Sequence, residues 1–411
     1  MVGRQEFFAT TVIERWLLFL GIVLLPLQDH IPSVAGVSVM FIVFAFMALY
    51  VVLIRSKFLV RTMVHPVFQT LYLLLAIAML MEFVHLDSNL FVIRRMLLMV
   101  FGALVLATLC RDQKALRVGV YSYLVSGFLM ALNMLIVGYE PLSLARVSTL
   151  EEAGAMQRMV SQEDLLRMNL NKMAFVIAQG AVVALVLGLA KRGRWWLLLF
   201  AVISAIGVTL TMSRGGLVIL GLTVLYILTL KGQMRWRMFA VLIIGLLVLY
   251  FLVPESALKR IELTDWNFLS DPHPSGRART YLAAVVHFRE YALYGVGFGN
   301  FWQKWGLSSW FRKGATVHGT HSYFISVWVY WGLFAELALL WTLIRLRKLL
   351  PRGEDVESFK LGLKVIAIST FLFMFLNNVL SDKSYSIIIG LLVGSNIWIY
   401  KPSDYLSKGK R

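Results

Sequence analysis

The sequence predicts an all-α, polytopic membrane protein. Of its 411 residues, 59% are hydrophobic and only 15% are charged, a composition too apolar for a soluble globular domain. The apolar residues fall in repeated runs of about 18 residues or more, which is the length that a helix needs to cross a bilayer. Short loops rich in Lys and Arg separate these runs, as the positive-inside rule predicts for a membrane protein.

We expect about twelve spanning helices, each bounded by polar or basic residues. In chain order they cover residues 8–28, 33–54, 64–84, 90–110, 118–137, 171–190, 195–212, 215–230, 237–253, 322–344, 361–380 and 384–400. The first run has no small-residue cleavage site, so we interpret it as a retained signal anchor. The single cysteine, Cys110, excludes an intrachain disulfide and is interpreted as a buried thiol.

Basic residues mark alternate loops. They are Arg55, Lys57 and Arg61; Arg111, Lys114 and Arg117; Lys191, Arg192 and Arg194; Lys231, Arg235 and Arg237; Arg345, Arg347, Lys348 and Arg352; and Lys401, Lys408, Lys410 and Arg411. These loops and both termini are therefore expected in the cytoplasm. The net charge of +18 is spread through them without the single patch or motif of a nucleic-acid-binding protein, so nucleic acid is not an expected partner.

The span pattern divides the chain into three segments. Residues 1–253 hold spanning helices one to nine with a medium extracytoplasmic loop near 138–170, residues 254–321 form one large extracytoplasmic loop, and residues 322–411 hold the last three helices and a cytoplasmic tail. Acidic and basic residues at helical spacing predict an interfacial amphipathic helix in the medium loop. In the large loop we expect a helix over 277–291, then a glycine-rich turn, then the next apolar helix.

A turn of sequence Ser213-Arg214-Gly215-Gly216 separates two short apolar runs and must lie close to the extracytoplasmic membrane surface. An arginine there opposes the positive-inside trend and is costly without a partner, which makes Arg214 a candidate functional residue. The alternative is a side chain that snorkels to lipid phosphates. The paired glycines favour function, because they let a ligand approach the backbone and expose amide donors to an anion.

Three more arginines lie on the same predicted side of the membrane. Arg277 and Arg279 open the expected loop helix, and Arg260 lies upstream. Guanidinium groups favour bidentate binding of phosphate or diphosphate, so these residues are candidate ligand-binding groups. A solvated basic face is the alternative.

His321 lies where the polar loop meets the tenth apolar run. A histidine of near-neutral pKa at such a boundary has the chemistry of a general base that takes a proton from a hydroxyl nucleophile. A helix cap or an interfacial histidine without function is the alternative. His318 lies three residues away, but no acid follows within the next turn and no zinc-type motif is present, so we do not expect a metal.

The stretch from Gly295 to Gly299 is not a dinucleotide site, because no strand precedes it and the nucleotide-binding spacing is absent. We expect a tight turn that returns the loop to the bilayer. The aromatic residues around it are expected to anchor at the membrane interface or to stack on a sugar. They are Phe298, Phe301, Trp302, Trp305 and Trp310.

Several short motifs occur in a fixed order along the chain. They are Asn169-Leu170-Asn171 with Ala174, Ser213 to Gly216, Gly276-Arg277 with Tyr281, Gly-Val-Gly-Phe-Gly-Asn-Phe at 295–301, and His321 with Gly332. Together they resemble the O-antigen ligase and polymerase superfamily. The layout resembles that family over most of the chain, whereas the specific motifs lie chiefly within 210–335.

The resemblance implies a GT-C-type glycosyltransferase of the bacterial inner membrane that moves a glycan from undecaprenyl diphosphate to an acceptor on the periplasmic face, without a cofactor or metal. By that resemblance, His321 is the base and Arg214 and Arg277 bind the carrier diphosphate. The substrate-contacting residues that we expect around them are Arg260, Arg279, His318, Ser322 and Tyr281. The family often has asparagine at the position of Ser322 and tryptophan at that of Tyr281, which weakens the acceptor details more than the reaction class.

Three functions stay open. A ligase uses a lipid A-core acceptor, and a polymerase uses a second carrier-linked glycan. One dominant outer loop and a chain near 400 residues favour the ligase. A transporter or flippase of lipid-linked glycan is the alternative of another class, but it should carry midplane polar groups or broken helices. The intramembrane polar residues noted, Asn133, Asn377, Asn378 and Glu336, are explained by helix-packing hydrogen bonds.

Overall fold

The computed structural model describes residues 9–27, 39–85, 91–163, 169–190, 194–229, 233–262, 281, 284–301, 322–350, 358–376 and 383–400. In chain order its elements are α2 Val12–Val23, the 3₁₀ turn η1 Leu25–Leu27, α3 Val39–Ile54, α4 Ser56–Met63, α5 Pro66–Val84, α6 Phe91–Leu109, α7 Gln113–Leu144, α8 Leu150–Glu163, α9 Leu170–Ala190, α10 Trp195–Leu210, α11 Arg214–Leu228, α12 Gln233–Leu252, α13 Glu255–Glu262, α15 Phe288–Tyr291, α17 Tyr323–Leu349, α18 Ser358–Leu376, α19 Lys383–Gly394 and the π-helical segment η2 Ser395–Tyr400. Among the described residues there is no strand.

The prediction of an all-α, polytopic membrane protein is confirmed. Each of the predicted runs coincides with a helix, and five helices of the described part are long and apolar enough to cross a membrane: α5, α6, α7, α9 and α17. The pair α3 and α4, bent by 102°, adds a sixth if it forms one span. The remaining apolar helices are shorter, so the number of about twelve spans stays a prediction.

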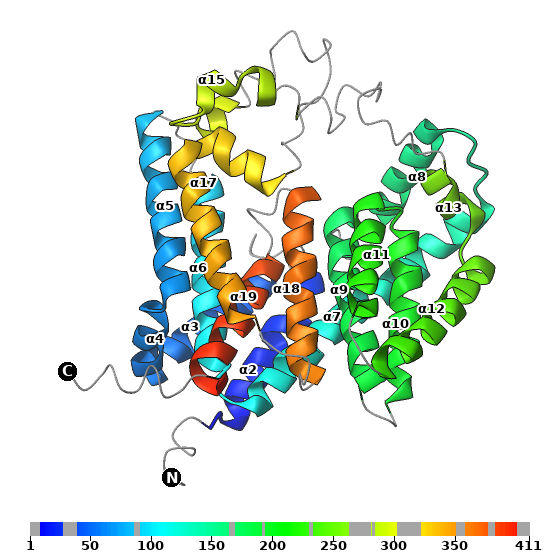
Figure 1. Cartoon of the computed structure of the whole chain (residues 1–411), viewed down its shortest axis with the longest axis horizontal. Coiled ribbons are helices and arrows are strands. Elements are labelled where there is room, and N and C mark those ends of the chain that lie inside the picture. The colour runs from blue at the N-terminus through cyan, green and yellow to red at the C-terminus, as the bar shows by residue number, and fades with distance from the viewer. Residues whose placement is uncertain are drawn as a thin grey trace.

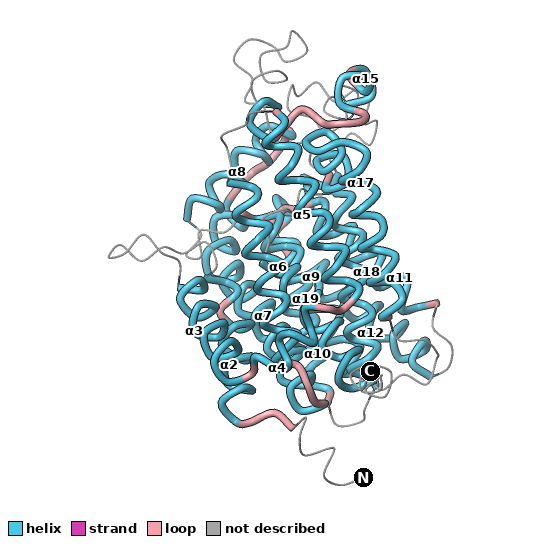
Figure 2. Tube along the Cα trace, turned by 90° about the vertical axis from the view of Figure 1, so that its left-hand side faces the viewer, coloured by secondary structure: helices cyan, strands magenta, loops and turns pink. Residues whose placement is uncertain are grey.

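The helices form a bundle with α18 at its centre (Figure 1). On one side lie α5, α6 and α17, and on the other lie α9 to α12; α18 contacts helices of both groups. Viewed from the side, α15 lies at one end of the bundle and α2 and α4 lie near the other (Figure 2). The helix α9 is almost wholly buried, since it packs against α7, α10, α11 and α18.

Polar contacts at one end of the bundle join two of the predicted cytoplasmic loops. Arg55, between α3 and α4, and Arg111, between α6 and α7, each donate to Oε1 of Glu14 at 2.6 Å. Glu14 and Arg111 are fully buried, and the Arg111 guanidinium lies 4.3 Å from the centre of the Phe58 ring. The two loops therefore lie at the same end, as the charge pattern predicts.

The opposite end brings together two loops that were predicted to share the other side. Nε2 of His85, which follows α5, lies 3.0 Å from the carbonyl oxygen of Tyr294, and Nδ2 of Asn300 donates to the His85 carbonyl at 3.2 Å. The turn at 85 and the end of the large loop are therefore neighbours. Which end faces the periplasm stays a prediction from the charge pattern.

Inside the bundle, Gln179 of α9 is a hydrogen-bonding centre that the sequence analysis missed. It accepts from the Tyr123 hydroxyl of α7, and its amide nitrogen lies 2.7 Å from Thr370 Oγ1 and 2.8 Å from Ser369 Oγ of α18. Side-chain hydrogen bonds of this kind fix the register between helices in a membrane. In contrast, Oε2 of Glu336 is buried without a hydrogen-bond partner in the described part of the chain.

The medium loop contains the amphipathic helix that its charge spacing predicts, although the helix is shorter than the loop. It is α8, which packs against the end of α7 and against α13. At its beginning, Glu152 accepts from the Ser148 backbone N–H at 2.8 Å, and this bond and those from the Ser148 hydroxyl and the Thr149 N–H hold the pKa of Glu152 below its usual value. This carboxylate fixes the entry into α8.

Candidate functional site

The turn that carries Arg214 is the start of α11, and it is tied to the start of α9. Ser213 is the N-cap residue: its Oγ accepts from the Gly216 N–H at 3.3 Å and donates to Oδ1 of Asn171 at 2.8 Å. Asn169 begins α9 in a similar way, because its Oδ1 accepts from the Asn171 N–H at 3.0 Å. The motif at 169–171 and the motif at 213–216, which lie far apart in the sequence, are therefore joined by a hydrogen bond at the beginnings of α9 and α11.

The backbone of this turn is strained. Met212 has φ +52, in the left-handed region that non-glycine residues rarely adopt, and its side chain is buried. Neighbouring groups hold the conformation: the Ser213 N–H donates to Oγ1 of Thr211 at 3.2 Å, and Nε2 of Gln157 in α8 donates to the Thr211 carbonyl at 3.0 Å. Strain of this kind persists where surrounding contacts over-determine the backbone, which is common at functional sites.

The two glycines of the turn have different surroundings. A Cβ at Gly216 would lie 2.6 Å from Cβ of Ala174 in α9, so this glycine permits a close helix contact. Nothing lies within 4 Å of the same position at Gly215. Gly215 is nevertheless buried, so a backbone open to a ligand stays a prediction there, whereas the Gly216 N–H already donates to the Ser213 cap and the residue packs against α9.

Arg214 is the first residue of α11, and it is exposed. None of the described residues gives its side chain a hydrogen bond or an ion pair, in contrast to the buried arginines at the other end of the bundle. A cation at a helix N-terminus is electrostatically unfavourable unless an anion is present, because both carry positive potential. The arrangement suits a doubly charged anionic ligand.

The helix that follows His321 is broken near its beginning. Ser322 is the N-cap of α17 and is buried, and the helix is interrupted at Gly332, which has φ 79 and ψ −171. As a result, α17 begins beside α18, runs across the top of the bundle toward α5, and turns down at the break (Figure 1). Only glycine adopts this conformation readily.

A buried carboxylate holds the break in α17. Glu82, near the end of α5, accepts from the Trp331 indole N–H at 2.6 Å and from the Phe298 backbone N–H at 3.2 Å. It therefore joins α5, α17 and the glycine-rich stretch. The sequence analysis missed Glu82, although a lone acid near the end of an apolar run was a signal that could have identified it.

The glycine-rich stretch is the tight turn that the sequence predicts. Gly295 and Gly297 have φ +69 and +79, and the N–H groups of Val296 and Gly297 donate to Val329 and Tyr330 of α17 at 2.9 Å. A Cβ at Gly295 would lie 2.3 Å from the Tyr330 carbonyl oxygen. Backbone hydrogen bonds therefore hold this stretch against α17, at a distance that leaves no room for a side chain at Gly295.

The aromatic residues of this stretch that the structure describes face inward. Phe301 is 1% exposed and packs edge-on against Tyr330, with ring centres 5.3 Å apart. Phe298 packs against the same ring at 5.2 Å. The prediction of an interfacial anchor or a sugar-stacking residue is wrong for Phe301, because its ring fills the junction with α17. Trp302, Trp305 and Trp310 lie outside the described residues.

The beginnings of α11 and α17 and the end of α18 lie at the same end of the bundle. Phe324 of α17 packs against Phe375 of α18, with ring centres 4.6 Å apart. At the other end, Nζ of Lys364 in α18 lies 5.8 Å from the centre of the Tyr226 ring in α11. At 1.5 Å per residue, Arg214 lies about 18 Å along α11 from Tyr226, and Phe375 lies about 17 Å along α18 from Lys364. Arg214 is thus level with Phe375, at the same end of the bundle as the start of α17.

The comparison with known proteins concerns this same part of the chain. Residues 199–340, which run from α10 through the large loop into α17, match the family described as O-antigen ligase. This segment is an O-antigen ligase domain. A search of curated proteins finds no match to the chain.

The O-antigen ligase domain contains all the predicted site residues, but the structure describes only some of them. Tyr281 is described, and its hydroxyl lies 3.5 Å from the Phe375 carbonyl oxygen, next to the start of α17. The backbone of Arg260 lies in α13, which packs against α7 and α8. The residues outside the described part are His318, His321, Arg277 and Arg279.

Within the described part of the domain, α15 is held by buried contacts. The Tyr291 hydroxyl donates to the Ala284 carbonyl at 2.7 Å, and burial raises the pKa of this tyrosine above its usual value. Among the described residues, no group of three or more His, Cys, Asp or Glu side chains lies close enough to hold a metal ion. Arg214 differs from Arg289, the other exposed arginine in the described part of the domain, because it opens a long helix directly after a strained turn, and this makes it the clearest candidate ligand-binding residue there.

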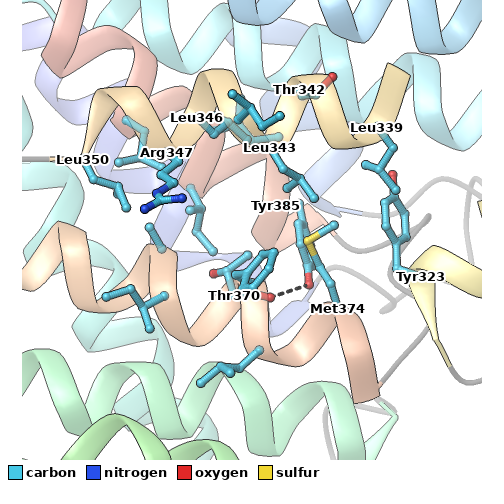
Figure 3. Close-up of a pocket in the computed structure, with 18 of the residues that line it drawn as sticks. Tyr323, Leu339, Thr342, Leu343, Leu346, Arg347, Leu350, Thr370, Met374 and Tyr385 are labelled. Carbon is cyan, nitrogen blue, oxygen red and sulfur yellow. Dashed lines mark hydrogen bonds between the residues drawn. The ribbon is translucent and has the colours of Figure 1, made fainter. Parts of the chain in front are cut away.

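A cavity of about 820 Å³ begins at the first residues of α17 and runs between α17, α18 and α19. Tyr323 and Phe324, which follow Ser322 directly, line this end of the cavity. Figure 3 shows Met374 and Tyr385 in its wall and Arg347 at the far end. The cavity extends from the side of Tyr323 and Phe324 toward Arg347.

Proposed function

We propose that the protein is a glycosyltransferase that moves a glycan from an undecaprenyl diphosphate carrier to an acceptor hydroxyl. The observation that carries this proposal is the shared position of three helix ends within or beside the O-antigen ligase domain. Arg214 opens α11 without a described partner, Ser322 opens α17 directly after His321, and both lie at the same end of the bundle as the last turn of α18.

The chemistry that we assign divides between a base and a set of arginines. His321 takes the proton of the acceptor hydroxyl, whose oxygen forms the new bond to the anomeric carbon. The bond between that carbon and the diphosphate oxygen breaks, and the diphosphate leaves with the bonding electron pair. Arg214 and Arg277 stabilise the negative charge that develops on it. Attack from the face opposite the leaving group inverts the anomeric centre.

The remaining predicted residues have supporting roles in this proposal. Arg260 and Arg279 add positive charge for the diphosphate, while His318, Ser322 and Tyr281 contact the glycan or the acceptor. No metal is needed, because diphosphate is already a good leaving group and the arginines neutralise its charge. The polar position of Tyr281 beside the start of α17 supports its assignment.

We further propose a ligase that uses a lipid A-core acceptor at the periplasmic face of a bacterial inner membrane. The match to the O-antigen ligase family supports this choice. The grouping of predicted outer loops at one end of the bundle supports a site on one membrane face. A polymerase would use the same groups with a second carrier-linked glycan as acceptor.

Reconstitution of the full chain in proteoliposomes tests the proposal. The assay offers purified undecaprenyl diphosphate glycan with lipid A-core or with a second carrier-linked glycan, and it measures the new glycosidic bond in the presence of a chelator. We expect transfer to lipid A-core that is abolished by His321→Ala and strongly reduced by Arg214→Ala and Arg277→Ala.

The other outcomes separate the alternatives. Full activity of His321→Ala would exclude this residue as the base. Transfer to the carrier-linked glycan alone would identify a polymerase, and loss of activity with chelator would contradict the metal-free mechanism. Movement of glycan across the bilayer without a new bond would identify a transporter.

A further inference from the structure

The cavity between α17, α18 and α19 has a chemistry that glycan transfer does not use. Its volume of about 820 Å³ lies in the range of about 300–1,000 Å³ that is usual for small-molecule sites. Its walls are almost entirely apolar side chains such as Leu343, Ile368 and Ile388. An apolar wall of this kind suits a hydrocarbon chain.

The length of the cavity fits one leaflet of a bilayer. On α18 its lining extends from Lys364 to Phe375, which is about 17 Å at 1.5 Å per residue. Half of a bilayer core is about 15 Å thick. One lipid chain of ordinary length therefore reaches from one end of the cavity to the other.

Two cations lie at the end of the cavity that is far from Ser322. Arg347 is in the last turn of α17 and is exposed, and Lys364 is near the beginning of α18 and is half-buried over the ring of Tyr226. Neither has a carboxylate partner among the described residues. Both line the same cavity as the apolar residues, so one end of an otherwise apolar cavity carries two positive charges.

We propose that this cavity binds an anionic phospholipid from the leaflet at the Arg347 end. The phosphate lies between Arg347 and Lys364, and an acyl chain fills the space along α18 toward Phe375. Basic residues at a membrane surface attract anionic headgroups, and an apolar cavity that opens beside them adds the hydrocarbon contact. The charge pattern of the sequence predicts that this leaflet is the cytoplasmic one.

The undecaprenyl carrier of the proposed reaction is a different lipid, and it does not use these two cations. Its diphosphate is assigned to Arg214, which lies about 18 Å along α11 from Tyr226 and therefore at the other end of the cavity. A carrier held there leaves Arg347 and Lys364 unengaged. The phospholipid site is thus independent of the proposed transfer reaction, and its test needs no measurement of activity.

The test measures which lipid the full chain retains. The detergent-purified protein is mixed with phosphatidylcholine vesicles that contain a minority of phosphatidylglycerol, and native mass spectrometry counts the lipids that remain bound. We expect one retained phosphatidylglycerol. The double variant Arg347→Ala with Lys364→Ala should bind it roughly thirtyfold more weakly, as expected for the loss of two surface cations.

A matched control removes the same amount of charge from the same end of the bundle. Arg61 and Lys348 are both exposed, and neither lines the cavity. The double variant Arg61→Ala with Lys348→Ala should therefore retain phosphatidylglycerol like the wild type. A third variant, Ala367→Trp, fills the cavity and leaves both cations, and it should lose the lipid while its thermal unfolding midpoint shows that it is folded.

The results that would overturn the proposal are specific. Equal losses in the two double variants would mean general attraction to the surface, without a site. Equal retention of phosphatidylcholine would remove the role of the phosphate charge. Undecaprenyl phosphate that displaces the bound phosphatidylglycerol in the wild type would assign the cavity to the carrier.

Discussion

The arginines at the two ends of the bundle show how one residue type serves structure or ligand binding. At one end, Arg111 is fully buried and Arg55 mostly so, and both donate to Glu14 at 2.6 Å. At the other end, Arg214 is exposed, begins a helix after a strained turn, and has no described partner. The charges of Arg111 and Arg55 are already compensated by Glu14, whereas the charge of Arg214 would be compensated only by a bound anion.

The difference has a simple electrostatic reason. A buried ion pair has already lost its water, so removing one partner leaves an uncompensated charge in an apolar environment. An exposed cation keeps its water until a ligand replaces it, so removing the cation costs binding and little stability. Substitutions at the two ends should therefore separate folding from activity.

The largest effect is expected from Glu14→Gln. It leaves the buried Arg111 guanidinium without a counterion and should destabilise the protein by about 3–5 kcal/mol, measured as thermal or denaturant unfolding in detergent. The control is Glu255→Gln, because Glu255 is 85% exposed and its pair with Lys259 is long, at 3.7 Å. That change should cost less than about 1 kcal/mol.

A second substitution sharpens the same test. Glu14→Gln combined with Arg111→Met removes both buried charges and should recover much of the lost stability, since well-packed apolar residues often replace a buried pair without penalty. If the Glu14→Gln protein kept its stability but lost glycan transfer, the ion pairs of Glu14 with Arg55 and Arg111 would serve activity and not folding. The contrast between the two ends would then be wrong.

The next largest effect is expected from Arg214→Ala. It should lower the rate of glycan transfer roughly 10²–10³-fold, as is common when one stabilising donor is removed from a developing anion. Stability should change by no more than about 0.5 kcal/mol, because the side chain is exposed and unpaired. Arg214→Lys should keep part of the activity, since lysine supplies the charge without the bidentate fork.

The control for this change is Arg289→Ala. Arg289 is an exposed arginine of α15 at the same end of the bundle. Its removal should leave the transfer rate within about twofold of the wild type, since surface changes away from a site have small effects. Equal losses in the two variants would mean that general surface charge, and not Arg214, recruits the donor.

A third effect is expected from Gly332→Ala, which tests how the start of α17 is held. The glycine has φ 79, and a Cβ there would lie 2.2 Å from the Leu293 carbonyl oxygen. Strain of this kind costs about 1–3 kcal/mol, and both stability and transfer should fall. Gly245→Ala, in α12 with nothing within 4 Å, should be neutral or slightly stabilising. Normal transfer by a Gly332→Ala protein would show that the break does not position the site.

Much of the helical layout follows from the sequence, because hydrophobic runs are local and long. The spans, the loops that share an end, and the amphipathic helix of the medium loop were all predicted from spacing and charge. The turn at 213–216 was also predicted, because an arginine between two short apolar runs is conspicuous. Each of these features depends on the sequence of a single segment and not on contacts with segments that are distant in the chain.

Contacts between distant segments could not be predicted in this way. Glu82 bonds to Phe298 and Trp331, which follow it by 216 and 249 positions, and nothing in the local sequence marks them as partners. Gly332 was noted as part of a motif, yet a single glycine inside an apolar run does not predict a positive φ. The resemblance grouped Asn171 with Ser213, but only the structure shows that they touch.

The smallest effect is expected from Ser213→Ala, and it distinguishes a positioning role from substrate contact. The change removes the cap on the Gly216 N–H and the bond to Asn171, and it should cost about 1 kcal/mol of stability. If the loosened turn raises the activation barrier by the same amount, transfer falls roughly fivefold.

Two variants serve as controls. Ser213→Thr keeps a capping hydroxyl and should restore both stability and the transfer rate. Ser143→Ala removes an exposed hydroxyl at the end of α7 and should change neither quantity. Because Ser213 is buried and already has two partners, a loss as large as that of Arg214→Ala would mean that the serine itself contacts the donor, and the turn would then bind the diphosphate through more than its arginine.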